Sequence, residues 1–254
     1  MKHTSLAAEQ FGATANAYLG SAVHAHGTDL QRLARVSRMD ATALDLGCGA
    51  GHASFAMAEG GARVTAYDVS HEMLAVVAAE ARRRGFAGVA TQQGTADRLP
   101  FADATFDLVA TRFSAHHWGD VPQALREARR VLKNSGTLVV IDPVAPESPL
   151  CDTLLQAVEI LRDASHVRNY RLSEWQAMLG NAGFARPVCD TWTLVMAFDT
   201  WVKRMRTPEL RVHAIRDVFA RAPDEARQHF HVLPDGSFDL TIAWLETRPR
   251  TAAA

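Results

Sequence analysis

The sequence lacks the features that mark secreted, disulfide-bonded or membrane-spanning proteins. Its 254 residues include three cysteines, Cys48, Cys151 and Cys189, which are scattered and form no C-x-x-C pair. This spacing excludes a disulfide framework and a zinc knuckle. No uninterrupted apolar run reaches membrane-spanning length, and the residues after Met1 contain no apolar signal-peptide segment. We therefore expect a cytoplasmic protein without stable membrane insertion.

The chain also lacks an excess of charge of either sign. Its 27 Lys and Arg residues are balanced by 28 Asp and Glu residues, which gives a formal net charge of −1. Without a basic excess, nucleic acid is not expected as the main partner. The basic run at 82–84 falls where a helix should end, and cations there complement the helix dipole.

Metal-ligand patterns are missing although the chain has eleven histidines. No pair has the i, i+4 spacing of a helical zinc site, and no nearby Cys or Glu completes a ligand set. We expect no bound metal. The tight groupings are His24 with His26, His116 with His117, and His229 with His231.

A glycine-rich turn is the strongest positive signal. Residues 43–51, ALDLGCGAG, indicate a short buried strand, a turn and the start of a helix. Glycine permits positive φ and close approach of a ligand to the backbone, and a helix that begins there presents free N–H groups. The turn is therefore a predicted cofactor cradle, in which Cys48 is a small residue that fills a tight space.

Alternating strand and helix patterns follow this turn. They predict a doubly wound α/β fold with right-handed crossovers and a largely parallel sheet. The expected strands are 43–46, 63–69, 89–93, 106–112 and 137–141, and the expected helices are 51–59, 70–84 and 121–132.

The chain is expected to have three parts. Residues 1–40 form an N-terminal helical lid, 41–145 the cofactor-binding core, and 146–254 the second half of the same domain with helical substrate-side insertions. Within the last part we expect helices at 150–161 and 199–231, a capping box at 173–176 that starts a short helix, and strands at 188–197 and 236–246. The last strand is interpreted as an edge strand, antiparallel and beside the fifth.

The turn does not match the dinucleotide-binding fingerprint. G-x-G-x-x-G counted from Gly47 requires a third glycine at His52, but this glycine comes one position early, at Gly51. Asp68 ends the second strand, where a carboxylate can accept hydrogen bonds from ribose hydroxyls. The cofactor is thus expected to carry a nucleoside.

An ordered set of motifs resembles the class I S-adenosylmethionine-dependent methyltransferases, in the small-molecule branch related to the quinone C-methyltransferases. The resemblance implies a seven-stranded Rossmann-like sheet with an antiparallel last strand, S-adenosylmethionine as cofactor and a small-molecule acceptor. The motifs are LDLGCGAG at 44–51, YDVS at 67–70, LPF at 99–101, FDLV at 106–109 and VLKNSGTL at 131–138.

The same resemblance implies roles for individual residues. Gly47 and Gly49, with Cys48 between them, contact the methionine portion and ribose, and Asp45 orients the loop and the amino group. An acid commonly follows Gly94 in the family, but here Thr95 and Ala96 follow. Adenine recognition is therefore expected to use Thr95 and backbone groups. The remaining implied contacts are Asp68 with the ribose, Val69, Met73 and Ala96 with the adenine, and Arg112 and Phe113 with the methionine end.

Methyl transfer from a sulfonium needs alignment and, for an acidic acceptor, a base. His116 or His117 is predicted to be that base, because both follow the fourth strand, at the sheet edge where ligands bind. The alternative is that they cap a helix or pack beside the cofactor. Tyr18 is expected to close over the sulfonium, and His166 and Arg168 to face the acceptor. Trp175, Trp192 and Trp201 are interpreted as packing residues.

The predicted function is methyl transfer from S-adenosylmethionine to an O, N or C nucleophile of a small molecule. Two alternatives stay open at this point: an NAD(P)-dependent oxidoreductase and a non-catalytic S-adenosylmethionine-binding protein. The arginine-rich segment 207–221 is interpreted as a solvated face or the surface of a homodimer.

Overall fold

A seven-stranded sheet runs through the molecule in a computed structural model that describes residues 3–12 and 27–250. The strand order is β3-β2-β1-β4-β5-β8-β7, and a short eighth strand, β6, pairs with β5 outside this path. All pairings from β3 to β5 are parallel, whereas β8 is antiparallel to both β5 and β7. The expected doubly wound sheet with an antiparallel last strand is confirmed. The strands are β1 Thr42–Leu46, β2 Arg63–Asp68, β3 Val89–Gln93, β4 Phe106–Arg112, β5 Leu132–Ala145, β6 Tyr170–Arg171, β7 Val188–Met196 and β8 Phe238–Thr247.

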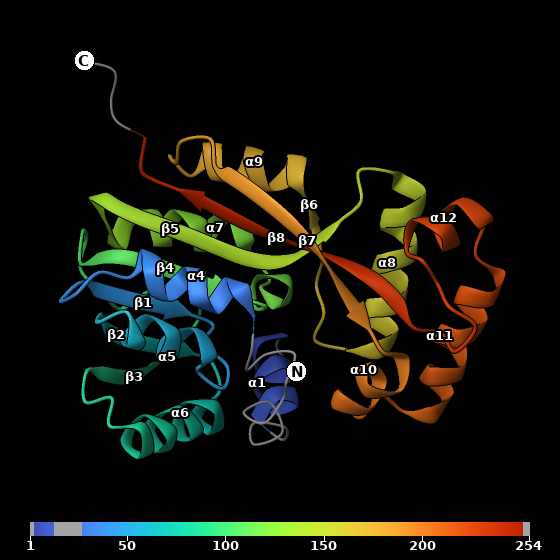
Figure 1. Cartoon of the computed structure of the whole chain (residues 1–254), viewed down its shortest axis with the longest axis horizontal. Helices are drawn as coiled ribbons and strands as arrows, with labels where there is room; N and C mark the ends of the chain where they lie inside the picture. Colours follow the sequence, from blue (N-terminus) through green and yellow to red (C-terminus); the bar gives the residue numbers. More distant parts are fainter. Residues whose placement is uncertain (1–2, 13–26, 251–254) are drawn as a thin grey trace.

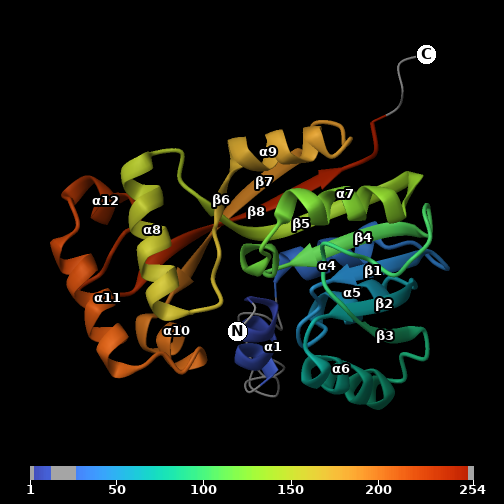
Figure 2. The ribbon, with the colours of Figure 1, turned by 180° about the vertical axis from the view of Figure 1, so that it is seen from behind.

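Helices cover both faces of this sheet. In Figure 1, α4 and α5 lie in front of the strands; in Figure 2, seen from behind, α7 and α9 lie in front of them. Successive side chains of β1 point to opposite faces of the sheet: Ala43 belongs to the buried cluster on one face, and Leu44 belongs to a second buried cluster on the other face. The helices of the core are α4 Thr28–Val36, α5 His52–Glu59, α6 His71–Arg84, α7 Val121–Val131 and α9 Leu172–Asn181.

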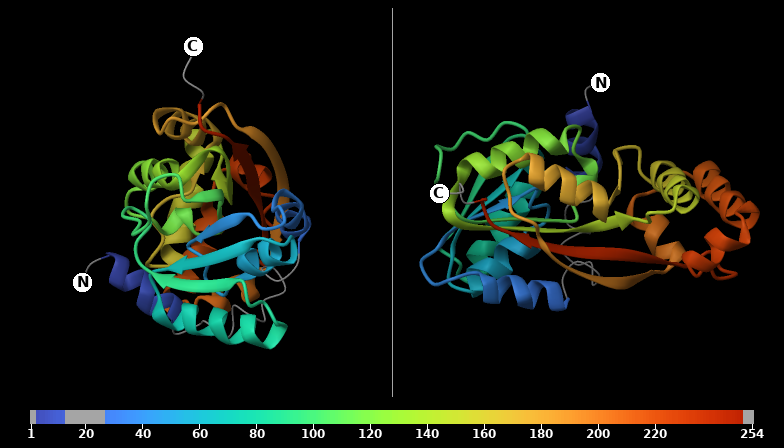
Figure 3. Two further views of the ribbon diagram at one scale, coloured as in Figure 1. Left: turned by 90° about the vertical axis from the view of Figure 1, so that its left-hand side faces the viewer. Right: turned by 90° about the horizontal axis from the view of Figure 1, so that it is seen from above.

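The carboxyl-terminal helices pack at the far end of β5, β7 and β8. Figure 3 shows these strands extending from the sheet into the helical part. Trp201 and Phe238 pack there edge to face, with ring centroids 5.0 Å apart, and both belong to the same buried cluster as Ala43. The helices are α8 Pro149–Arg162, α10 Phe198–Arg204, α11 Glu209–Arg221 and α12 Asp224–His229.

The short helix α1 (His3–Gly12) lies between the sheet and this helical part (Figures 1 and 2). The side chain of His3 donates a hydrogen bond to the carbonyl oxygen of His117, at 2.9 Å. On the other side, the Gln10 amide donates to the carbonyl oxygen of Met205, at 3.0 Å. Helix α1 therefore bridges the two parts. Tyr18 lies outside the described residues.

Four expectations about individual elements were wrong. Strand β8 is not an edge strand, because it lies between β5 and β7. Strand β5 begins at Leu132 and ends at Ala145, so it extends beyond the expected strand 137–141 at both ends. The expected helix 199–231 is three helices, because Pro208 and Pro223 each precede a new helix start. Helix α9 begins at Leu172, where the Glu174 carboxylate accepts a hydrogen bond from the backbone N–H of Arg171.

No helix in residues 3–12 and 27–250 combines the length and apolarity needed for a membrane span.

Helix α6 offers a test of local stabilisation. Ser70 Oγ accepts a hydrogen bond from the backbone N–H of Met73, at 3.2 Å, whereas Ser148 precedes α8 without any side-chain cap. We expect Ser70→Ala to lower the free energy of unfolding by about 0.5–2 kcal/mol. The control, Ser148→Ala, should change it by less than about 0.5 kcal/mol. Urea denaturation measures both, and equal losses would contradict the assignment of the cap.

Candidate active site

The larger of two neighbouring cavities lies at the carboxyl ends of β1, β2 and β4 and has a volume of about 400 Å³. This is where ligands bind in open α/β sheets. Most of the residues predicted from the sequence line it. They are Asp45, Gly47, Cys48, Gly49, Asp68, Val69, Met73, Thr95, Ala96, Arg112, Phe113 and His117.

The glycines of the turn serve two different purposes. Gly47 and Gly49 both have positive φ, of 74° and 50°. A Cβ on Gly47 would lie 1.9 Å from Ser114 Oγ, so Gly47 lets the turn pack against the end of β4. A Cβ on Gly49 would meet nothing within 4 Å. Only Gly49 therefore leaves bare backbone open to the cavity.

The carboxylate of Asp68 holds this turn in place. Its Oδ2 accepts a hydrogen bond from the backbone N–H of Gly49, and its Oδ1 accepts one from Ser70, both at 2.9 Å. Burial raises the pKa of Asp68, and these backbone bonds partly offset the effect. Each oxygen retains a lone pair with which a further donor can be bound.

Asp45, on β1, carries a buried oxygen with an unmet hydrogen bond. Its Oδ2 accepts from Ser54 Oγ at 2.6 Å, while its Oδ1 has no partner among the described residues. Burial raises the pKa of Asp45 to about 7, against the lowering effect of the Ser54 bonds. A cationic donor in the cavity would satisfy this oxygen and favour the ionised carboxylate.

The end of β4 is fixed by a buried ion pair. Arg112 Nε lies 2.5 Å from Asp29 Oδ2, and both side chains are almost fully buried. The next residue, Phe113, has a φ of 51°, a left-handed conformation that is strained for an aromatic residue. Its backbone N–H bonds to Ile141 on β5, at 2.8 Å. Phe113 lines both the larger and the smaller cavity.

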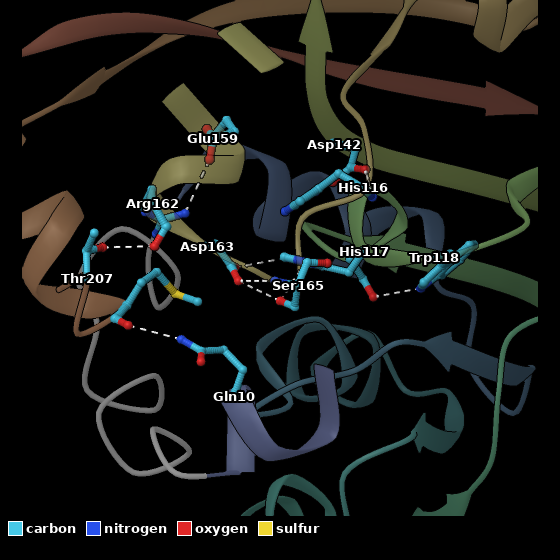
Figure 4. Close-up of polar contacts among 12 residues, drawn as sticks. Gln10, His116, His117, Trp118, Asp142, Glu159, Arg162, Asp163, Ser165 and Thr207 are labelled. Carbon is cyan, nitrogen blue, oxygen red and sulfur yellow. Dashed lines mark hydrogen bonds and ion pairs between the residues drawn. The ribbon is translucent and has the colours of Figure 1, made fainter. Parts of the chain in front are cut away.

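His116 is held by a carboxylate at two points (Figure 4). Its Nδ1 lies 2.8 Å from Asp142 Oδ1, and its backbone N–H donates to Asp142 Oδ2 at 3.0 Å. Burial alone would lower the pKa of His116, but the neighbouring Asp142 carboxylate outweighs this and raises it. In the neutral imidazole, Nδ1–H donates to Asp142 and Nε2 keeps a lone pair.

His117 has a different environment. Burial, followed by the charge of His116, lowers the pKa of His117 well below its ordinary value, so the ring is neutral. Its Nδ1 lies 3.1 Å from the Ser165 carbonyl oxygen, and Phe11 of α1 packs against it edge to face at 4.7 Å. His117 is thus positioned by packing and a backbone bond, without a close carboxylate; Asp163 Oδ2 is 4.0 Å away.

The smaller cavity, of about 70 Å³, adjoins the larger one and shares Phe11, Phe113 and His117 with it. In Figure 4 the His116 ring extends from Asp142 toward the side on which Glu159 and Arg162 lie. The smaller cavity is further lined by His116, Pro143, Glu159, Arg162, Leu194, Met196, Trp201, Arg204, Leu240 and Ile242.

The two residues predicted to face the acceptor line neither cavity. His166 is buried, and its Nε2 lies 3.0 Å from the side-chain oxygen of Gln156. Burial lowers the pKa of His166 to about 3. Arg168 forms an ion pair with Asp152 at 2.7 Å. Both therefore hold the segment after α8. In the described part of the chain, His, Cys, Asp and Glu side chains form no group suited to a metal ion.

Sequence reasoning missed several polar residues of the site, among them Asp142, Glu159 and Arg162. Asp142 was signalled by its position, as a lone acid in the apolar strand around 137–141. Glu159 and Arg162 gave no comparable signal, because acidic and basic residues three apart on a helix usually form a solvated pair. Trp201, interpreted as a packing residue, is 1% exposed as expected but also lines the smaller cavity.

Comparison with known proteins shows one consistent similarity. Residues 44–140 match the family model for the methyltransferase domain. The chain is 39% identical to YcgJ of Bacillus subtilis, named a methyltransferase, over 87% of this chain and 88% of that protein. The crystal structure of YcgJ superimposes with a TM-score of 0.84, covering 89% of this chain and all of the other.

Two further relatives extend this similarity. YafE of Escherichia coli, named an uncharacterized protein, is 45% identical over 77% of this chain and 95% of its own. A demethylmenaquinone methyltransferase of Chlorobaculum parvum is 36% identical over 44% of each chain.

The two glycines can be separated by mutation. Gly47→Ala should lower the free energy of unfolding by roughly 2–5 kcal/mol, because strain at positive φ adds to the clash with Ser114. Gly49→Ala should lower the free energy of unfolding by only about 1–2 kcal/mol. It should weaken binding of S-adenosylhomocysteine at least about tenfold, because the methyl group of the new alanine side chain would enter the cavity. Urea denaturation and calorimetry measure the two effects.

Gly85 supplies the matched control, because it also has positive φ and open space around its Cβ position, but lies outside both cavities. Gly85→Ala should lose as much stability as Gly49→Ala and keep full affinity. Equal affinity of the two variants would contradict the role assigned to Gly49.

Proposed function

Because the chain belongs to the methyltransferase domain family, whose relatives include the quinone C-methyltransferases, we propose that its larger cavity binds S-adenosylmethionine and its smaller cavity the acceptor. The protein is an S-adenosylmethionine-dependent methyltransferase. The family match and the relatives do not favour the nicotinamide-dependent alternative, which the position of Gly51 already opposed. The acceptor is a small molecule; the quinone substrates in some relatives' names belong to those proteins.

The unpartnered Oδ1 of Asp45 is the observation that supports the cofactor assignment best. It is a buried acceptor at the wall of a cavity of suitable size, beside the open backbone of Gly49. The ammonium group of the cofactor's methionine portion is a donor that meets this need. The residues fit the cofactor in the other respects too, since Asp68 offers acceptor positions for ribose hydroxyls.

The other contacts follow from the lining of the larger cavity. Val69 and Met73 offer apolar surface to the adenine, and Thr95 and Ala96 offer polar groups to its edge. Arg112 and Phe113 border the methionine end, where the two cavities meet. S-adenosylmethionine supplies an activated methyl group on a sulfonium, so the protein chiefly has to align the acceptor and remove its proton.

His116 is the base in this proposal. Its Nε2 lone pair accepts the proton of the acceptor's nucleophilic atom, and bound S-adenosylmethionine would supply the activated methyl group to that atom. Asp142 fixes the tautomer by accepting the Nδ1–H bond. His117 helps to position the reacting groups, because its neutral ring lines both cavities where these groups would meet.

The Asp45 assignment predicts a pH-dependent affinity. The pKa of Asp45, about 7, lies above its ordinary value, so the carboxyl is neutral below pH 7 and ionised above it. An ammonium group binds the ionised form. We expect affinity for S-adenosylhomocysteine to be full near pH 7.5 and roughly tenfold or more weaker at pH 5.5, with proton release on binding at the lower pH.

Isothermal titration calorimetry in buffers of different ionisation heat measures both affinity and proton release. Asp45→Asn should bind weakly at every pH and release no proton. A wild-type affinity that does not change between pH 5.5 and 7.5 would refute the Asp45 assignment. Absence of S-adenosylhomocysteine binding at any pH would refute the proposed function of the larger cavity.

The base assignment predicts how His116 titrates. NMR should place its pKa above 6.5, and Asp142→Asn should lower the pKa, because burial then acts without the carboxylate. The turnover rate should rise with pH through the pKa of His116. His116→Ala should reduce turnover by roughly 10²–10⁴-fold and leave affinity for S-adenosylhomocysteine unchanged.

His213 provides the control, since it lies 3.9 Å from Glu209 in an exposed imidazole–carboxylate pair on α11. His213→Ala should keep wild-type turnover. Wild-type turnover in His116→Ala as well would exclude His116 as the base. The other ionisable groups that act on His116 are Glu159, Asp163, His117 and His166, so their variants must be checked for indirect shifts.

A further inference from the structure

We propose that the acceptor carries a carbonyl or carboxylate oxygen, and that the smaller cavity binds this oxygen through the guanidinium of Arg162 and the indole N–H of Trp201. This inference rests on the proposed function, in which the acceptor occupies the smaller cavity with its nucleophilic atom at His116. It adds the chemical class of the acceptor and the two residues that select it.

The indole of Trp201 supplies the first observation. Its side chain lines the smaller cavity and is 1% exposed, yet its Nε1–H has no partner among the described residues. Rings of Phe198 and Phe238 pack against it and offer no acceptor oxygen. An unsatisfied buried donor is costly. A ligand oxygen in the adjoining cavity would satisfy it.

Arg162, the last residue of α8, brings further donors to the same place. Its Nε donates to the Trp201 carbonyl oxygen at 3.1 Å, and its guanidinium lies 5.0 Å from the Trp201 ring centroid. Its Nη1 is 3.5 Å from Glu159 Oε2, which is long for a charged pair, and Nη2 has no hydrogen-bond partner among the described residues. Arg162 thus keeps donor capacity beside the indole of Trp201.

The charge around the cavity favours an oxygen acceptor over a cationic group. Two guanidinium groups, of Arg162 and Arg204, line it, together with one carboxyl group, that of Glu159. Burial raises the pKa of Glu159, so this carboxyl opposes the cations less than an exposed one would. An ammonium-bearing acceptor would face like charge here. A carbonyl or carboxylate would not.

The remaining walls and the volume limit the acceptor's size. Phe113, Met196, Leu240 and Ile242 present apolar surface. A volume of about 70 Å³ holds roughly five to seven waters. This suits one substituted aromatic ring in the cavity that His116 and Arg162 both line. The acceptor is therefore expected to be a compact ring with an acidic hydroxyl, or other nucleophile, and a separate C=O group.

Three probes with one ring and nearly one shape test this inference: 3-hydroxybenzoate, 3-hydroxyacetophenone and 3-isopropylphenol. Their dissociation constants are measured by ligand-detected NMR with the protein saturated by S-adenosylhomocysteine. We expect the two probes that carry a C=O group to bind at least roughly tenfold more tightly than 3-isopropylphenol, and we call this ratio of dissociation constants the selectivity ratio. The order of the first two reports whether the site prefers a charged or a neutral oxygen.

Variants then show which residues cause the difference in affinity between the probes. Trp201→Phe removes the N–H and keeps an aromatic ring, and should reduce the selectivity ratio severalfold. Arg162→Gln combined with Glu159→Gln removes the guanidinium without leaving a buried carboxyl unpaired, and should bring the ratio close to one.

Each variant has a matched control. Trp175 is also 1% exposed with an unpartnered indole N–H, but lines neither cavity, so Trp175→Phe should keep the wild-type ratio. Arg216 lies over the Phe198 ring and pairs with Asp199 at the surface, so Arg216→Gln should keep it as well.

The inference is overturned if neither probe with a C=O group binds the wild-type protein at millimolar concentration, or if the wild-type selectivity ratio is near one. It is also overturned if the ratio survives in both the Trp201 and the Arg162 variants. In those cases S-adenosylhomocysteine would still bind, and the proposed function would stand. Loss of S-adenosylhomocysteine binding by the wild-type protein would instead refute the proposed function itself.

Discussion

The carboxylate of Asp68 accepts hydrogen bonds from the backbone N–H groups of Gly49 and Ser70, and the geometry of the larger cavity depends on this bridge. Gly49 belongs to the turn after β1, and Ser70 caps α6, so one side chain at the end of β2 aligns two neighbouring βα connections. These hydrogen bonds fix the positions of both backbone N–H groups. The turn is therefore already ordered for a ligand before one binds.

Buried carboxylates recur at the same edge of the sheet. Asp45 in β1 accepts a hydrogen bond from Ser54 with one oxygen and leaves the other available to a ligand. Asp142 in β5 uses both oxygens to bind His116, one to its backbone N–H and one to its ring. Burying such groups is costly. At Asp45 the cost appears as a raised pKa, whereas the Asp142 carboxylate raises the pKa of His116 against the lowering effect of burial. The buried carboxylates therefore lower the stability of the fold but create an electrostatic environment that suits binding and proton transfer.

The second cavity has a different origin, because parts of the chain that are distant in sequence enclose it. Phe11 comes from α1, Phe113 and His116 from the end of β4, and Arg162 and Trp201 from the carboxyl-terminal helices. The long strands β5 and β8 carry those helices past the edge of the parallel sheet. The cofactor side is thus built from consecutive βα units, and the acceptor side from pieces that meet only after folding.

The sequence by itself determined the doubly wound sheet, the glycine turn and the residues around it, because these depend on local signals: apolar periodicity, helix caps, and glycines followed by a helix. It could not place β8 between β5 and β7, because strand order depends on which edges remain free once the other strands have paired. It could not distinguish Gly47 from Gly49 either, since Ser114, which makes the difference, is 67 residues away from Gly47 along the chain. Only the tertiary structure brought Asp142 to His116 and Arg162 to Trp201, because burial and long-range packing decide which polar groups lose water and must find partners within the protein or a ligand.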